Sequence, residues 1–206
     1  MSESLPTATF NLETAFAKIT GPVIAGVDEA GRGPLAGPVT AAAVVFAKDA
    51  IPPGLADSKT LSPARREQLF DAIMAQALAV AIGSSPAQEI DAINIRQATF
   101  AAMRRALAGL ALRPDGALID GRDKPPGIPC PAQAIIKGDA KSVSIAAASI
   151  VAKVTRDRLM DRLAADCPGY GFERHAGYPT AAHREAIKRL GPSPWHRRSF
   201  RLLKPA

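Results

Sequence analysis

The stretch from Val23 to Val39 most constrains how this chain can fold. It reads Val-Ile-Ala-Gly-Val-Asp-Glu-Ala-Gly-Arg-Gly-Pro-Leu-Ala-Gly-Pro-Val. The short, partly β-branched run 23–27 favours a buried strand, and this strand ends on two adjacent carboxylates, Asp28 and Glu29. The residues that follow, Gly31-Arg32-Gly33-Pro34, predict a turn, because two glycines are free to adopt positive φ and a proline sets the exit direction.

The paired carboxylates favour a functional site. Neighbouring residues of a strand point to opposite faces, so strand geometry alone does not bring Asp28 and Glu29 together. We expect one to act from the strand and the other from the turn, where the glycines let the chain bend. A solvated strand end is the simpler explanation of a lone Asp-Glu pair, because desolvating a carboxylate is costly. Here, however, the pair adjoins a glycine-arginine-glycine turn whose bare amides can approach a ligand closely.

The charge balance favours an anionic partner such as nucleic acid. The 206 residues carry a net charge of +7, which bears on association and not on fold. No apolar run approaches the ~20 residues that span a membrane, and the N-terminus lacks the pattern of a signal peptide. Cys130 and Cys167 lie far apart without metal-type spacing, which is typical of reduced thiols. We therefore expect a cytoplasmic protein without membrane contact, and a monomer is the simplest state.

The chain length suits one well-buried domain. We expect residues 1–20 to form a loosely ordered lead-in, with one helical turn around residues 12–17, and residues 21–206 to form the domain, including a C-terminal helical region. The pattern predicts strands over 23–27, 39–46, 78–83, 116–119 and 134–137, and helices over 63–76, 88–110, 144–166 and from about 180. An initial hairpin followed by alternating strands and helices indicates an α/β domain, with a mixed central sheet flanked by helices. His183, in the last helix, is expected at the surface.

The predicted helix over 144–166 carries an acid on its apolar face. The stripe that includes Ile150 and Val154 continues, three residues on, to Asp157. This position favours a role for the acid at the edge of the core. Alternatively, Asp157 forms an ion pair with Lys153, four residues earlier on the same helix.

Acids at the ends of several elements predict a metal site. Asp28 and Glu29 follow one strand, Asp120 follows another, and Asp157 lies on a helix. Like charges gathered closely would repel and raise one another's pKa unless a cation neutralised them. Ligands that are all oxygen suit Mg²⁺ or Mn²⁺ rather than zinc. A basic chain with an acidic metal site is the combination expected for phosphodiester hydrolysis with two metal ions.

The motifs that carry these acids resemble a known family. The run 27–34 is similar to the signature of the type 2 ribonucleases H (ribonuclease HII), and further motifs follow in family order to about residue 200. They are Asp57-Ser58-Lys59, Asn94-Ile95, Leu118-Ile119-Asp120-Gly121, Ser144 to Ile150, Lys153 to Asp157, and His196 to Phe200. The resemblance implies a ribonuclease H-like fold and a divalent-metal endonuclease. Its substrates would be RNA–DNA hybrids, cut in the RNA strand, or duplex DNA with a single embedded ribonucleotide. The family's four metal-site acids map onto Asp28, Glu29, Asp120 and Asp157.

The resemblance also implies how a ribonucleotide is recognised. The 2′-hydroxyl distinguishes RNA from DNA at a nucleotide, and the family reads it with the backbone of the turn, here Gly31, Arg32 and Gly33. A tyrosine stacks on the neighbouring deoxyribose, and Tyr178 in His175-Ala176-Gly177-Tyr178 matches it, with Tyr170 as the alternative. Ala176 stands where the family usually has lysine, which puts one nearby basic contact in doubt.

Two further basic segments are candidates for nucleic-acid contacts. Lys59, in the loop after Asp57, is expected to contact a phosphate, although an ordinary surface lysine would look the same. The tail Trp195-His196-Arg197-Arg198-Ser199-Phe200 interleaves aromatic and basic residues. It could line a nucleic-acid groove, or its aromatics could pin the tail to the domain.

Taken together, the residues and the resemblance predict an endoribonuclease. It would hydrolyse the phosphodiester 5′ to a ribonucleotide with Mg²⁺ or Mn²⁺, leaving 3′-hydroxyl and 5′-phosphate ends. One rival is a DNA nuclease of the same fold, such as a junction resolvase, which would be indifferent to ribonucleotides. Another is a basic nucleic-acid-binding module with structural acids, which would bind hybrids without cleaving them.

Overall fold

A five-stranded mixed sheet forms the centre of the protein. The computed structural model describes residues 8–56 and 58–203, so Asp57 of the predicted lysine-bearing loop lies outside the described residues. The strand order is β3-β2-β1-β4-β5. β1 pairs antiparallel with β2 and parallel with β4, which confirms the predicted hairpin and the mixed sheet. The strands are β1 (Ile24–Ala30), β2 (Val39–Val45), β3 (Ala79–Ser85), β4 (Gly116–Asp120) and β5 (Ala132–Ile135).

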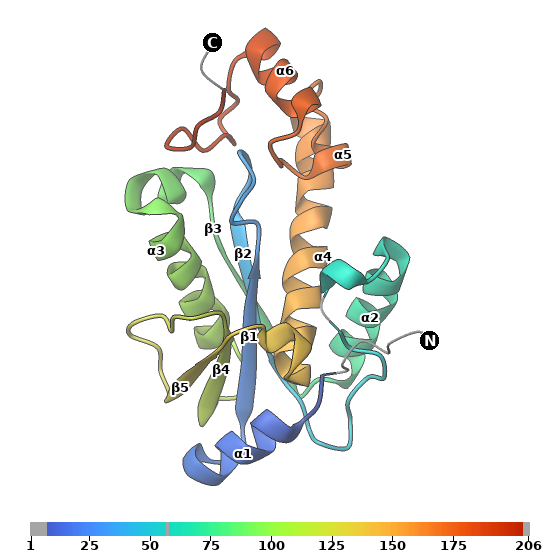
Figure 1. Ribbon diagram of the computed structural model, residues 1–206, viewed down its shortest axis with the longest axis vertical. Helices are drawn as coiled ribbons and strands as arrows, with labels where there is room; N and C mark the ends of the chain where they lie inside the picture. The colour runs from blue at the N-terminus through green and yellow to red at the C-terminus, as the bar shows by residue number, and fades with distance from the viewer. Residues whose placement is uncertain (1–7, 57, 204–206) are drawn as a thin grey trace.

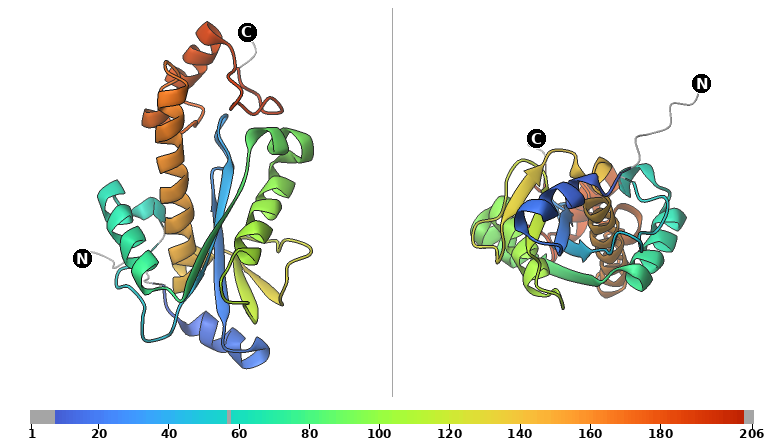
Figure 2. Two further views of the ribbon diagram at one scale, coloured as in Figure 1. Left: turned by 180° about the vertical axis from the view of Figure 1, so that it is seen from behind. Right: turned by 90° about the horizontal axis from the view of Figure 1, so that it is seen from below.

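Helices cover both faces of the sheet and extend beyond one end of it (Figure 1). α3 lies on one face and the long α4 on the other, with α2 outside α4 (Figure 2). α1 lies at one end of the sheet, whereas α5, α6 and the C-terminal tail lie at the opposite end. α5 and α6 form the predicted C-terminal helical segment. The helices are α1 (Asn11–Thr20), α2 (Pro63–Gln76), α3 (Ala87–Ala108), α4 (Val143–Asp166), α5 (Phe172–His175) and α6 (Ala181–Leu190); the 3₁₀ turns are η1 (Ser58–Thr60) and η2 (Gly138–Ala140).

Side-chain caps determine where several helices begin. The Ser62 hydroxyl accepts a hydrogen bond from the Arg65 amide at 3.2 Å and Pro63 occupies the first helical position, as predicted. α3 contains a sharp bend that the sequence periodicity does not reveal. Asn94 adopts φ 66° there, and its Oδ1 accepts from the amide of Arg96 at 3.0 Å, which caps the second part of the helix.

The core is divided by the sheet, because alternate residues of the strands face α3 and α4. Val27 and Ile119 belong to the α3 side, whereas Val44 packs with α2 and α4. α4 lies directly against β1 at Gly26, where an added Cβ would stand 2.1 Å from the carbonyl carbon of Ser144. This close contact brings the middle of α4 next to the acidic end of β1.

Two expectations are wrong because distant segments pack where the local pattern suggests none. The lead-in holds a helix of 10 residues, α1, instead of a single turn. Its Glu13 is 1% exposed, and Oε1 accepts hydrogen bonds from the hydroxyls of Ser142 and Ser144 at the start of α4. His183 is 0% exposed and not at the surface, because α6 turns it toward α5 and the tail.

Gly26→Ala tests the contact between β1 and α4. The new methyl group would meet backbone atoms that cannot move aside, so we expect the free energy of unfolding to fall by about 3 kcal/mol in urea titrations. Gly33→Ala is the matched control, because its Cβ would meet only a Tyr178 ring carbon at 3.8 Å. Equal stabilities of the two variants would contradict the packing described.

Candidate active site

Asp28 and Glu29 both lie within β1, which corrects the expectation that one acts from the turn. They therefore point to opposite faces of the strand. Asp28 is 5% exposed, and Ser149 of α4 is one of the groups that act to lower its pKa. Glu29 borders a cavity of about 300 Å³ together with residues of α3, including Phe100 and Met103. The two carboxylates thus flank the end of one strand.

Asp120 joins this pair from the neighbouring strand. β4 runs parallel to β1 with Ile119 opposite Val27, so Asp120 follows beside Asp28. Its Oδ1 accepts a hydrogen bond from the Gly138 amide at 2.7 Å, and it borders the same cavity as Glu29. The sequence prediction that these three acids meet is therefore consistent with the strand register.

The three carboxylates affect one another electrostatically. Burial, followed by the charges of Glu29 and Asp120, raises the pKa of Asp28 well above its ordinary value. Burial also raises the pKa of Glu29, whereas the Arg32 guanidinium, 3.4 Å from Glu29 Oε1, opposes that shift. A cation between the carboxylates would relieve this repulsion.

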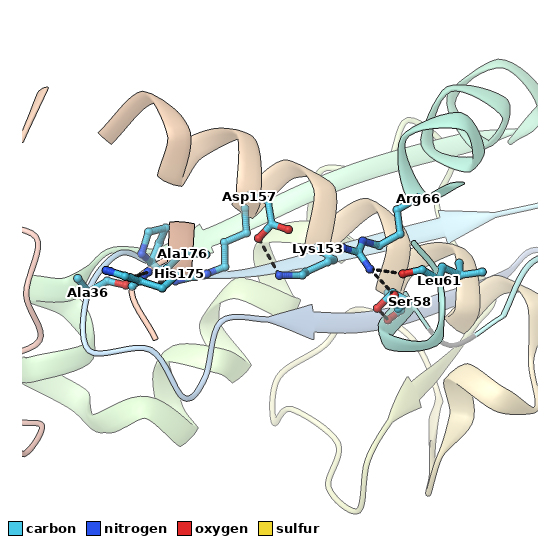
Figure 3. A network of polar contacts seen from close by, with 12 residues as sticks. Ala36, Ser58, Leu61, Arg66, Lys153, Asp157, His175 and Ala176 are labelled. Carbon is cyan, nitrogen blue, oxygen red and sulfur yellow. Dashed lines mark hydrogen bonds and ion pairs between the residues drawn. The ribbon is translucent and has the colours of Figure 1, made fainter. Parts of the chain in front are cut away.

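Asp157 stands apart from these three acids. Its Oδ1 accepts from Lys153 Nζ at 2.8 Å, and Figure 3 shows the two side chains facing each other along α4. The Asp157 side chain is 33% exposed and borders a second cavity, of about 590 Å³. Ile150 and Val154 are buried as the stripe predicts, and the alternative ion pair with Lys153 is present as well.

The donor set fits a hard divalent cation at the strand ends. Within residues 8–56 and 58–203, no group of three or more His, Cys, Asp or Glu side chains stands close enough to ligate one ion. Asp28, Glu29 and Asp120 nevertheless offer only carboxylate oxygens, the donors that Mg²⁺ and Mn²⁺ prefer. Asp157 is paired with Lys153 in this structure.

A buried guanidinium holds the turn that follows the acids. Arg197, which is 0% exposed, donates to the carbonyls of Gly31 at 2.6 Å, Arg32 at 2.9 Å and Gly37 at 2.9 Å. Burial, together with the charge of Arg156, lowers the pKa of Arg197 to about 9, so the side chain is still cationic at neutral pH. Arg197 therefore attaches the tail to the domain, and the aromatic residues Trp195 and Phe200 pack partly buried against the core as well.

A second buried guanidinium holds the other side of the turn. Arg156 of α4 is 1% exposed and donates to the carbonyls of Pro38, Ala36 and Ala176 at 3.0 to 3.1 Å. Gly31 adopts φ 93°, and a Cβ there would lie 2.0 Å from Arg156 Nε. Glycine is thus required at this position by both conformation and space.

Tyr178 lies beside the turn. The space above Gly33 opens toward a ring carbon of Tyr178, 3.8 Å from where a Cβ would be, and the tyrosine is 41% exposed. Lys153 Nζ lies 6.0 Å from the centre of the ring. Tyr170 instead stacks on Phe172 and donates its hydroxyl to a backbone carbonyl, so its role is structural.

The loop that carries Lys59 is tied to the acids through hydroxyl groups. Lys59 is exposed in η1. The hydroxyl of Ser58 lies 2.9 Å from that of Ser149, whose side chain acts to lower the pKa of Asp28. Arg66 donates to the carbonyl of Ser58 at 2.9 Å and holds the loop against α2, as Figure 3 shows.

Comparison with known proteins identifies the family. The family model described as Ribonuclease HII matches residues 25–203. Ribonuclease HII of Brucella canis is 59% identical over 182 residues, which cover 88% of this chain and 83% of that protein.

The chain belongs to the ribonuclease HII family. Ribonuclease H2 from Pyrococcus horikoshii OT3 superposes with a TM-score of 0.73 at 30% identity, covering 87% of this chain and 94% of that one. A Bst-RNase HIII structure, solved in complex with Mn²⁺, has a TM-score of 0.70 at 21% identity, covering 87% of this chain and 67% of that one, and shows a shared fold. The protein is a metal-dependent ribonuclease of the RNase H fold, and its family cleaves the RNA strand of RNA–DNA hybrids.

Sequence reasoning missed several residues that shape the site. Arg156 and Arg197 occur among other basic residues, and nothing local marks them as buried. Ser58 and Ser149 lie in motifs that resemble the family, and this was the one available signal for them.

Arg197→Lys tests the support of the turn. Lysine retains the charge but cannot donate to three carbonyls in a fork, so we expect a loss of about 2–3 kcal/mol of unfolding free energy. Amide hydrogen exchange in residues 31–38 should also accelerate. The adjacent Arg198→Lys is the control, because Arg198 is exposed and should change stability by less than about 0.5 kcal/mol. Equal effects would show that Arg197 does not hold the turn.

Proposed function

We propose that this protein cuts on the 5′ side of single ribonucleotides embedded in duplex DNA, as well as in the RNA strand of hybrids. The products would carry 3′-hydroxyl and 5′-phosphate ends. The observation that carries the proposal is the position of Gly31–Gly33. This turn closely follows Asp28 and Glu29. Arg197 donates a hydrogen bond to the Gly31 carbonyl, and Arg156 donates one to the carbonyl of Pro38, further along the same segment.

The direction of the peptide groups supports a role of the turn in reading the ribose. The carbonyls of Gly31 and Arg32 accept from the buried Arg197. No cis peptide bond occurs among the described residues, and in a trans peptide the carbonyl and the following N–H point in opposite directions. The N–H groups of Arg32 and Gly33 therefore point away from Arg197, where a 2′-hydroxyl could meet them.

The acids are proposed to hold Mg²⁺ or Mn²⁺. Asp28, Glu29 and Asp120 would ligate the metal, and Asp157 would join them after releasing Lys153. Bound there, a divalent ion supplies an activated water and charge stabilisation at the leaving oxygen, with two ions as the favoured arrangement. The Mn²⁺ complex of the Bst enzyme, which shares the fold, supports this choice. No covalent nucleophile from the protein is needed.

Basic residues around the acids would hold the nucleic-acid backbone. Arg32, Arg96 and Arg122 border the cavity that contains Glu29 and Asp120. Lys59 and the net charge of +7 add to an electrostatic attraction that does not depend on sequence. None of the helices in the described residues is long and apolar enough to cross a membrane. We propose that the protein acts as a monomer in the cytoplasm.

Cleavage of a labelled duplex with one ribonucleotide tests the proposed reaction. With Mg²⁺ or Mn²⁺ we expect a single cut 5′ to the ribonucleotide, no cut of the all-DNA duplex, and no activity with chelator. Asp120→Asn should slow cleavage about 100-fold or more, because it removes a ligand charge. Asp71→Asn, which makes the same change on the exposed face of α2, should cleave normally.

Other outcomes would assign the protein to a rival class. Equal cutting of the all-DNA duplex would remove the proposed reading of the 2′-hydroxyl and indicate a DNA nuclease. Binding of both duplexes without metal-dependent cleavage would indicate a nucleic-acid-binding module.

Tyr178→Ala tests the proposed stacking partner. Loss of an aromatic stack costs about 1–3 kcal/mol, so kcat/KM on the single-ribonucleotide duplex should fall about 10- to 100-fold. Tyr178→Phe keeps the ring and should retain most activity. If both variants lose the same activity, the hydroxyl and not the ring face is the functional group.

A further inference from the structure

Three histidines, all those in the chain, gather where α5, α6 and the C-terminal tail meet. His183 and His196 are buried, at 0% and 1% exposure, and their Nε2 atoms lie 3.0 Å apart. The ring of His175 stacks on that of His183 at 4.4 Å. None of these residues belongs to the acid site, so the cluster needs its own explanation.

The hydrogen-bond partners define the proton positions in this cluster. His196 Nδ1 accepts from the Ser193 amide at 2.9 Å, so Nδ1 carries no proton and Nε2 donates toward His183. His183 Nδ1 lies 2.9 Å from the Tyr178 carbonyl and must donate to it, which leaves Nε2 as the acceptor. The two rings thus form one directed chain from Ser193 to Tyr178 in which both are neutral.

This chain of hydrogen bonds ends on the proposed ribose-stacking residue. It also lies where the segments of the site are joined. His196 pairs with Ala36 in a β-bridge and immediately precedes Arg197. The Leu35 amide donates to the Gly177 carbonyl at 2.7 Å, next to Tyr178. The histidine pair therefore connects the tail, the turn and the segment that carries Tyr178.

We propose that His183 and His196 are positioning residues for ribonucleotide recognition: as a neutral pair they fix the backbone of Tyr178 beside the Gly31–Gly33 turn. The proposal rests on the role of Tyr178 in the proposed function. The histidines themselves do not touch the substrate. They act through the Tyr178 carbonyl, so their removal should impair the same step as loss of the Tyr178 ring.

The geometry also predicts that the pair resists protonation. A proton added to His183 Nε2 would place two N–H groups against each other across 3.0 Å, and a proton added to His196 Nδ1 would face the Ser193 N–H across 2.9 Å. Burial, followed by the charge of His183, lowers the pKa of His196 to about 4, and burial lowers the pKa of His183. The titratable or charged groups that face the pair are His175 on α5, Tyr170 before it and Arg184 on α6.

Ring-nitrogen NMR of the whole protein tests the pair independently of activity. In ¹⁵N-labelled protein at pH 7 we expect His183 protonated at Nδ1 only and His196 at Nε2 only. His196 should stay neutral as the pH is lowered to about 5. A charged ring at pH 7, or the opposite proton positions, would overturn the proposed chain.

Kinetics of His183 variants test the connection to Tyr178. The amide of His183→Asn can still donate near the position of Nδ1, whereas His183→Ala cannot. We expect His183→Ala to raise KM for the single-ribonucleotide duplex about tenfold with a smaller change in kcat, and His183→Asn to recover much of the loss. Lys188→Gln, on the exposed side of α6, controls for general effects on that helix and should match the wild type.

A double variant separates positioning from a merely structural role. If His183 acts through Tyr178, then Tyr178→Ala with His183→Ala should be no worse than Tyr178→Ala alone. Fully additive losses, or equal losses by His183→Ala and His183→Asn, would overturn the proposal. If the wild type shows no preference for ribonucleotides, the proposed function fails. The NMR spectra still test the proton positions of the histidine pair independently.

Discussion

Two buried guanidiniums are the interactions on which the rest of the site depends. Desolvating a cation is costly unless strong hydrogen bonds replace water, and here each guanidinium donates to three backbone carbonyls. Arg156 reaches from α4 and Arg197 from the tail. Together they join the turn after β1, the Tyr178 segment and the C-terminal tail, so these segments cannot move independently. The cost of desolvating the two guanidiniums is offset only when the turn has this conformation. We therefore expect the turn to hold this conformation before substrate binds.

The sheet brings the acids to this turn. Parallel pairing of β1 with β4 sets Asp120 beside Asp28, and the close approach of α4 at Gly26 places Ser149 over Asp28. Mutual repulsion and burial then raise the pKa of Asp28. Asp157 remains bound to Lys153, so the set of four acids implied by the family resemblance is not assembled in this structure. Exchange of that ion pair for a metal is a step the proposed function requires.

Local patterns in the sequence predicted the elements whose formation depends on interactions between neighbouring residues. Two short apolar runs joined by a turn predicted the hairpin, and Ser62 with Pro63 predicted the start of α2. Residues whose role arises from distant contacts were not predictable. Glu13 caps the start of α4 across 131 positions, and His183 is buried only because the tail folds back over α6. A single sequence shows such a residue as one more polar position on a helix.

The acids and the turn differ in how far the sequence alone reveals them. Asp28, Glu29 and Asp120 follow predicted strands, and the parallel pairing of β1 with β4 is consistent with the prediction that they lie near one another. The expectation that one of the two carboxylates acts from the turn was wrong, because β1 continues to Ala30. Gly31 needs its positive φ, whereas a Cβ at Gly33 would make only an ordinary contact with the Tyr178 ring.

A crystal structure of the complex with Mn²⁺ and a duplex containing one ribonucleotide is the most direct test of the account. The Asp120→Asn variant would keep the substrate intact. We predict the 2′-hydroxyl within hydrogen-bonding distance of the backbone of residues 31–33, anomalous scattering from Mn²⁺ beside Asp28 and Glu29, and a turn within about 1 Å of its free conformation. A turn that refolds on binding, or a 2′-hydroxyl facing elsewhere, would contradict the claim that the buried arginines preform the site.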